Sequence, residues 1–131
     1  MAPNRCPCLS GLTYDECCGR LHRGEGAQTA EALMRSRFSA FAVGDVEYLR
    51  RTWHRRTRPD DLALDPDVRW YRLDVLAATD GGPGERAGTV EFRAFYRSSA
   101  GAGSQHETSR FVRASGEWVY LDGLDGLDGA P

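Results

Sequence analysis

The residues with the clearest chemistry are the cysteines, and all four fall within the first eighteen positions of the 131-residue chain. They form two close pairs, Cys6-Pro-Cys8 and Cys17-Cys18, separated by eight residues. A turn between the pairs can fold the second onto the first, so that four thiolates form the tetrahedron preferred by zinc or a single iron. The spacing predicts a metal knuckle over residues 1–24 with the ligands Cys6, Cys8, Cys17 and Cys18.

Clustered cysteines can instead form a disulfide or a redox-active dithiol. The N-terminus lacks the apolar run of a signal peptide, and no segment approaches the roughly 18 apolar residues of a membrane span, so we expect a cytoplasmic protein without membrane insertion. In that reducing compartment, clustered cysteines are more often metal ligands. A Cys17–Cys18 bridge would be strained, and the C-x-x-C redox spacing is absent. Metal binding is therefore favoured, with zinc ahead of iron.

Polar residues on a predicted strand suggest a second site. Side chains alternate between the two faces of a strand, so Glu107, Ser109 and Phe111 share one face. If the apolar Phe111 points into the core, Glu107 and Ser109 also point inward. Val112 lies on the other face and favours the opposite orientation. His54, at a helix end, could face the Glu107 carboxylate as a general base. The alternative is a buried polar network that fixes the helix to the sheet. The pocket candidates are Trp53, His54, Glu107, Ser109 and Tyr120.

The run Arg50–Arg58 contains five arginines with Trp53 and His54 between them. This composition is typical of a contact with phosphate, nucleic acid or the ribosome. The alternative is a solvated helix end, whose dipole the arginines complement. In that case nearby carboxylates would neutralise the run: Asp60, Asp61, Asp65 and Asp67. The formal net charge of the whole chain is −2, which argues against a general nucleic-acid binder.

The elements that position these residues are predicted from hydrophobic periodicity. Cys17 and Cys18 are expected to open a helical turn that Gly19 ends. A helix follows over residues 30–43, with Thr29 as its N-cap and Arg37 off its apolar stripe, and a second short helix begins after Asp45. From Trp70 the period changes to two. Strands are predicted over 70–78, 88–98, 105–114 and 117–121, with residues 100–103 as a loop.

This order of elements indicates an α+β fold, in which the helices pack on a curved antiparallel sheet. The expected organisation is a metal knuckle over 1–24 and a cone-shaped domain over 25–123. Leu-Asp-Gly is repeated three times from Leu121 onward, and residues 124–131 are predicted to form a flexible acidic tail.

The pattern C-x-C-x8-C-C, with Ser10-Gly11 after the first pair and Tyr14 before the second, resembles the SEC-C motif of the SecA preprotein translocase. The strings at 32–41, 52–54, 106–111 and 116–123 are similar to the bacterial YchJ family. This resemblance implies a SEC-C motif ahead of a nuclear transport factor two-like, cystatin-like cone. It also implies that the four cysteines are metal ligands. It brings no activity, because the family is functionally uncharacterised.

These features predict a metal-binding accessory or interaction protein rather than an enzyme. Four protein thiolates leave no open position for a substrate or an activated water, so the metal is expected to be structural and the knuckle to dock a protein partner. The sequence has no glycine-rich phosphate loop, nucleophile elbow or HExxH pattern. The alternatives are an enzyme or small-ligand binder that uses the cone pocket, and a nucleic-acid contact through Arg50–Arg58.

Overall fold

The computed structural model describes residues 5–123, which contain three helices followed by four strands. The helices are α1 (Cys18–His22), α2 (Ala30–Val43) and α3 (Val46–Arg51). The strands are β1 (Arg69–Asp80), β2 (Ala87–Ser98), β3 (Gly101–Ala114) and β4 (Glu117–Gly123). They form one antiparallel sheet in the order β1-β2-β3-β4. The predicted α+β fold is confirmed, and the predicted acidic tail at 124–131 lies outside the described residues.

The two main helices begin and end at local capping signals. The Thr29 hydroxyl accepts a hydrogen bond from the backbone N–H of Ala32 at 3.0 Å, and the Asp45 carboxylate accepts one from Tyr48 N–H at 3.0 Å. Between the helices, Gly44 ends α2 with a φ of +81°, a conformation that glycine adopts without strain. These contacts are local in sequence, and the bounds of α2 and the start of α3 therefore match the prediction. The expected end of the second helix is wrong, because α3 ends at Arg51 and His54 lies beyond it.

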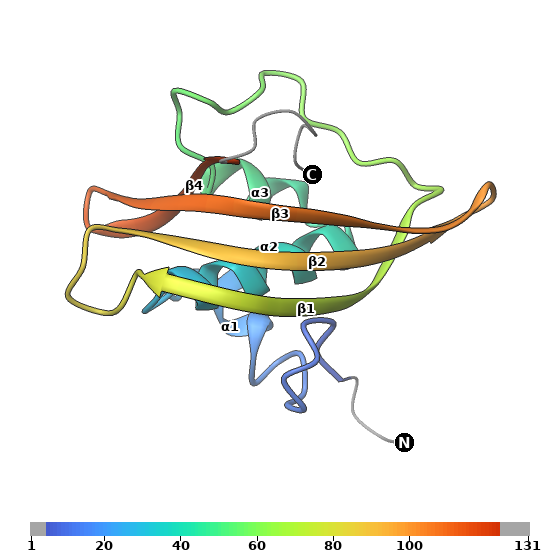
Figure 1. Ribbon diagram of the computed structural model, residues 1–131, viewed down its shortest axis with the longest axis horizontal. Coiled ribbons are helices and arrows are strands. Elements are labelled where there is room, and N and C mark those ends of the chain that lie inside the picture. The colour runs from blue at the N-terminus through green and yellow to red at the C-terminus, as the bar shows by residue number, and fades with distance from the viewer. Residues whose placement is uncertain (1–4, 124–131) are drawn as a thin grey trace.

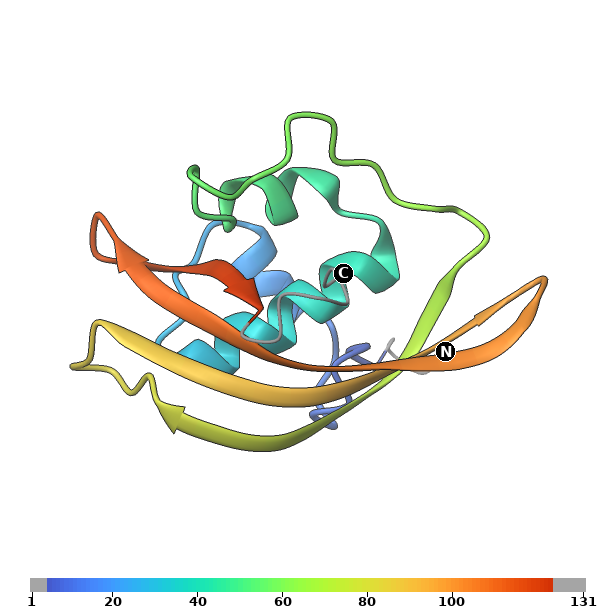
Figure 2. The same ribbon diagram turned by 45° about the horizontal axis from the view of Figure 1, so that its top comes forward.

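The sheet curves, and the helices lie on its concave side (Figure 1, Figure 2). β2 alternates as predicted, because Val90, Phe92 and Ala94 are buried while Arg93 is exposed. These buried side chains pack with Leu33 and other residues of α2 in the main hydrophobic core. Burial of the two apolar faces against each other gives the cone its shape.

Two expected boundaries are wrong. Residues 101–103 are not a loop, because β3 begins at Gly101 and pairs with the end of β2. Gly103 lies under the Tyr96 ring, where an added Cβ would be 2.6 Å from the hydroxyl, so glycine here permits close packing. Gly19 does not end α1, which continues to His22. A Cβ on Gly19 would lie 2.7 Å from the carbonyl oxygen of Tyr14, so this glycine also serves packing.

Candidate metal centre and the cone cavity

The four cysteine sulfur atoms converge at one point in the N-terminal segment. All four Sγ atoms lie within 4.8 Å of one another. The Sγ–Sγ distance is 3.6 Å between Cys8 and Cys17 and 4.0 Å between Cys17 and Cys18. A tetrahedral zinc with Zn–S bonds of about 2.3 Å needs sulfur atoms about 3.8 Å apart. The arrangement can therefore hold a metal ion, and all four residues are free cysteines.

A tight turn brings the two pairs together. The N–H of Leu9 donates to the Cys6 carbonyl at 3.0 Å, and the N–H of Cys6 donates to the Leu12 carbonyl at 2.9 Å. Leu9 and Gly11 both have positive φ, of +66° and +93°. Gly11 adopts this conformation readily, whereas Leu9 is strained and must be held by its surroundings. The turn thus places the sulfur atoms of the first pair against those of the second.

The proximity of the thiols separates their pKa values. Hydrogen bonds, first from Cys18 and then from Cys8, lower the pKa of Cys6 far below its ordinary value. The pKa of Cys18 is raised, first by its hydrogen bond to Cys6 and next by its hydrogen bond to Cys8. Without a cation, therefore, the neighbouring sulfur atoms share protons through these hydrogen bonds. Metal binding must displace such protons, because the thiolate is the ligand.

The knuckle is packed against the cone rather than set apart from it. The sulfur of Cys6 lies 3.5 Å from the hydroxyl of Ser39, a fully buried residue of α2. One turn earlier on α2, the guanidinium of Arg35 donates to the carbonyl of Cys8 at 3.3 Å. Both contacts fix the first cysteine pair to the long helix, so the metal centre is supported by the cone.

His22 is the main link between the two parts. Its side chain is 4% exposed, and its Nε2 donates to the Ser36 carbonyl at 2.9 Å. Nδ1 forms a hydrogen bond with the Tyr14 hydroxyl and lies 3.7 Å from the Asp45 carboxylate, and the centroids of the imidazole and the Tyr48 ring are 4.4 Å apart. His22 is therefore an anchor for the knuckle and lies outside the cysteine shell.

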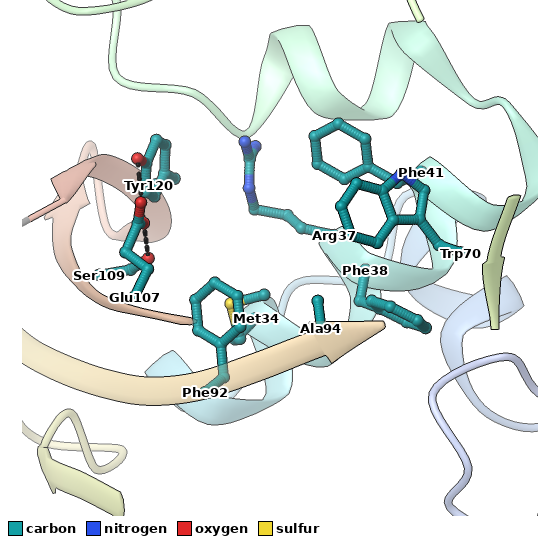
Figure 3. Close-up of a pocket in the computed structure, with 10 residues that line it drawn as sticks. All are labelled: Met34, Arg37, Phe38, Phe41, Trp70, Phe92, Ala94, Glu107, Ser109 and Tyr120. Atoms are coloured by element: carbon teal, nitrogen blue, oxygen red, sulfur yellow. Dashed lines mark hydrogen bonds between the residues drawn. The ribbon is translucent and has the colours of Figure 1, made fainter. Parts of the chain in front are cut away.

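Glu107, Ser109 and Tyr120 come together in a small cavity inside the cone (Figure 3). The Ser109 hydroxyl donates to the Glu107 carboxylate, and the Tyr120 hydroxyl donates to the same oxygen at 3.4 Å. Glu107 and Ser109 are buried, as an inward Phe111 predicts. The cavity volume is about 20 Å³, the space of a water molecule or two. In this conformation it has no room for a substrate.

Arg37 shares this cavity, and the prediction that it lies off the apolar stripe is wrong: it is four residues from both Leu33 and Phe41 and shares their buried face. It is 3% exposed, and its guanidinium donates to the Leu49 carbonyl at 3.0 Å and the Thr52 hydroxyl at 2.8 Å. The guanidinium also stacks against the Trp53 and Tyr120 rings, at 5.0 and 4.8 Å from their centroids. The spacing from Leu33 and Phe41 could have indicated this burial, because residues four apart share a helix face. The residue type pointed the other way, since arginine is seldom buried.

The structure does not bring His54 into the cavity with Glu107. His54 lines a separate surface groove, and its Nδ1 accepts from the backbone N–H of Arg56 at 3.1 Å. Trp53 lines the same groove and packs edge-on against Tyr120, with 5.2 Å between ring centroids. The five pocket candidates are therefore divided between an internal polar network and a surface groove.

Fold and site together define a nuclear transport factor two-like domain preceded by a SEC-C motif. The model of the SEC-C motif matches residues 4–20, and that of the YchJ middle NTF2-like domain matches residues 29–123. The chain belongs to the YchJ family, also named UPF0225. No helix within residues 5–123 is long and apolar enough to cross a membrane.

Related sequences and structures cover nearly the whole chain. A UPF0225 protein of Corynebacterium glutamicum is 57% identical over 120 residues, which are 91% of this chain and 95% of the relative. One of Streptomyces coelicolor is 56% identical over 119 residues, 90% of this chain and 93% of the relative. The solution structure of a SEC-C motif protein from Rhodopseudomonas palustris matches with a TM-score of 0.76 at 37% identity, covering 90% of this chain and 95% of that one. The crystal structure of a SEC-C motif protein from Psychrobacter arcticus matches with a TM-score of 0.72 at 32% identity, covering 89% of this chain and 80% of that one.

Proposed function

We propose that this chain is a zinc-dependent interaction protein in which four cysteines hold one structural zinc ion. The observation that carries the proposal is the convergence of four sulfur atoms at the spacing of a tetrahedral site. A complete thiolate shell leaves no coordination position for a water or a substrate, so the ion would serve structure. Iron also accepts four thiolates, and its charge-transfer absorption in the visible would distinguish it from colourless zinc.

Nearby hydroxyl groups suit a negatively charged thiolate shell. Ser10 Oγ donates to the Cys17 sulfur at 3.1 Å, and Ser39 Oγ lies 3.5 Å from the Cys6 sulfur. Hydrogen bonds to ligand sulfur atoms disperse thiolate charge and fix the orientation of the ligand. Ser39 belongs to α2, so the same contact would couple metal binding to the stability of the cone.

The turn between the cysteine pairs exposes two large apolar side chains. Leu9 and Leu12 lie on the turn between the cysteine pairs and are 56% and 50% exposed. Large apolar side chains that gather on a small exposed loop are typical of protein-interaction sites. We propose that zinc holds this turn in shape and that a partner protein buries the two leucines.

Partner binding is tested by capture on immobilised, zinc-loaded protein, followed by direct affinity measurement with the purified partner. The double variant Leu9→Ser/Leu12→Ser should lose the partner while keeping its zinc. Leu76→Ser removes a leucine that is 51% exposed on β1 and is the matched control. Equal partner binding by the double variant and the wild type would refute the docking role. The metal site is tested separately, by measuring whether Cys17→Ser loses its zinc.

A further inference from the structure

A surface groove of about 750 Å³ lies between two walls. The first is the end of α3 with the segment that follows it, and the second is the β3–β4 hairpin. The first wall contains Arg51, Arg55, Arg56 and Arg58, and the second wall contains Glu117. We call this hollow the arginine groove. Both walls lie at the same end of the sheet (Figure 1). The volume falls within the roughly 300–1,000 Å³ of ligand-binding clefts, in contrast to the nearly filled cone cavity.

The arginine groove concentrates positive charge. Four arginines face one glutamate in its lining, a formal balance of +3, whereas the whole chain carries −2. Among residues 5–123, no arginine of the run Arg50–Arg58 pairs with a carboxylate. The acidic residues expected to neutralise the run are engaged elsewhere in two cases: Asp67 accepts from Ser99, and Asp65 caps the Asp67 N–H. The positive charge of the groove is therefore not neutralised. Arg51 donates to the Leu21 and His22 carbonyls and Arg58 donates to the Arg50 carbonyl, so Arg55 and Arg56 are the groove arginines whose guanidinium groups bond no residue of the described chain.

The backbone of the first wall is held in place by β4. His54 N–H donates to the Tyr120 carbonyl and Tyr120 N–H donates to the Thr52 carbonyl, both at 2.7 Å. The Thr57 hydroxyl donates to the Leu121 carbonyl at 2.6 Å. These bonds fix the path of the segment beside the sheet, so the groove is formed before any ligand arrives. A preformed site loses less conformational entropy on binding.

The groove offers the donors and the flat rings that suit nucleotides. Arg55 and Arg56 are exposed, and a guanidinium can bond two oxygens of one phosphate. Because Nδ1 of His54 accepts from the Arg56 backbone, the neutral ring carries its proton on Nε2 and can donate it. His54 and Trp53 add two flat rings to the lining, and such rings stack with bases. The Arg37 guanidinium already covers one face of the Trp53 ring, so only its other face could stack. An acidic peptide would use the arginines but would leave the rings without a stacking partner.

We propose that the arginine groove binds the phosphate backbone of single-stranded nucleic acid, with the guanidinium groups on phosphates and a ring of the Trp53-His54 pair beneath a base. This site is separate from the knuckle and does not depend on the proposed docking function. Glu117 opposes the ligand, since a carboxylate in the groove repels phosphate. The proposal therefore predicts opposite effects for changes on the two walls.

The test is fluorescence anisotropy of a labelled oligouridine or oligothymidine titrated with the zinc-loaded full chain. Arg55→Ser/Arg56→Ser should weaken binding at least tenfold. It should also lower the slope of log affinity against log salt by about 1.4, at roughly 0.7 per lost single-strand phosphate contact. Glu117→Gln should tighten binding two- to threefold. Arg93→Ser, which removes an exposed charge from β2, is the control and should change nothing.

Three results would overturn the proposal. The first is no binding at low salt by correctly folded protein. The second is an equal loss of affinity in Arg93→Ser and in the groove double variant, which would indicate nonspecific charge attraction. In the third, a polyglutamate peptide or inorganic polyphosphate displaces the labelled oligonucleotide as effectively as unlabelled oligonucleotide does. Neither competitor carries bases, so this result would show that base stacking contributes nothing to binding. Circular dichroism and zinc content establish that each variant is folded.

Discussion

Replacing Arg37 with methionine tests whether the buried guanidinium holds the cone together. The methionine keeps most of the apolar stem but removes two hydrogen bonds, to the Leu49 carbonyl and the Thr52 hydroxyl. It also removes the cation that stacks on the Trp53 and Tyr120 rings. We expect the variant to fold with a smaller free energy of unfolding, because α2, α3 and β4 all meet at this side chain.

The size of the loss follows from three contributions. Two hydrogen bonds from a charged donor contribute about 3–6 kcal/mol, and two cation–π contacts about 1–4 kcal/mol. Against these, desolvation lowers the pKa of Arg37 from 12.5 to about 10, a penalty on the buried charge of about 3 kcal/mol that methionine relieves. The expected net loss is about 3 kcal/mol, which would lower the melting temperature by roughly 10 °C.

The assay is urea unfolding of the zinc-loaded protein, followed by tryptophan fluorescence. Arg93→Met is the matched control, since Arg93 is exposed, and it should change the free energy of unfolding by less than about 0.5 kcal/mol. An Arg37→Met variant as stable as the wild type would refute the structural role. It would mean that the cost of burying the charge equals what its contacts contribute.

Three further predictions concern the knuckle and the cone. His22→Phe keeps a ring against Tyr48 but removes the bond to the Ser36 carbonyl and leaves the Tyr14 hydroxyl without its histidine partner, so it should cost about 2 kcal/mol of stability and speed zinc transfer to a chelator. Unchanged stability and an unchanged transfer rate would show that His22 is not the anchor. Burial raises the pKa of Tyr120, whereas an unfolded tyrosine ionises near 10. As the pH rises, the unfolded state therefore releases this proton first, so the free energy of unfolding measured in urea should fall above about pH 10. The fall should be less steep in Tyr120→Phe. Equal slopes of unfolding free energy against pH in the two proteins would contradict this prediction. Acid should release the metal, because protons compete with it for the thiolate ligands. A zinc-responsive dye should detect release between about pH 6 and 4, and full retention below that range would contradict a site of four thiolates.

The parts of the fold that the sequence predicted are those set by local signals or simple periodicity. Thr29, Gly44 and Asp45 act within one turn of their own positions, and their caps lie where expected. The alternation of β2 likewise follows from its own residues. The four cysteines were recognisable because ligand type and spacing together leave few alternatives to a metal site.

What the sequence did not predict depends on contacts between distant segments. The spacing of Arg37 from Leu33 places it on the buried face of α2, but the groups that satisfy its charge lie on α3 and β4, and the helix alone does not record them. The separation of His54 from Glu107 results from backbone pairing between residues 52–54 and β4, a parallel contact that no turn signal specifies. The strand character of residues 101–103 comes from pairing with β2, which backbone groups make whatever the side chains.

The most direct test of the central claim is the metal content of the purified chain, measured by inductively coupled plasma mass spectrometry beside a thiol count. The proposal predicts one zinc per chain in the wild type and substoichiometric zinc in Cys17→Ser. Ser99→Ala is the control and should keep its zinc, because Ser99 bonds Asp67 and lies outside the cysteine cluster. Stoichiometric zinc in Cys17→Ser would contradict the site of four thiolates, as would a wild-type protein without metal whose cysteines are oxidised to disulfides.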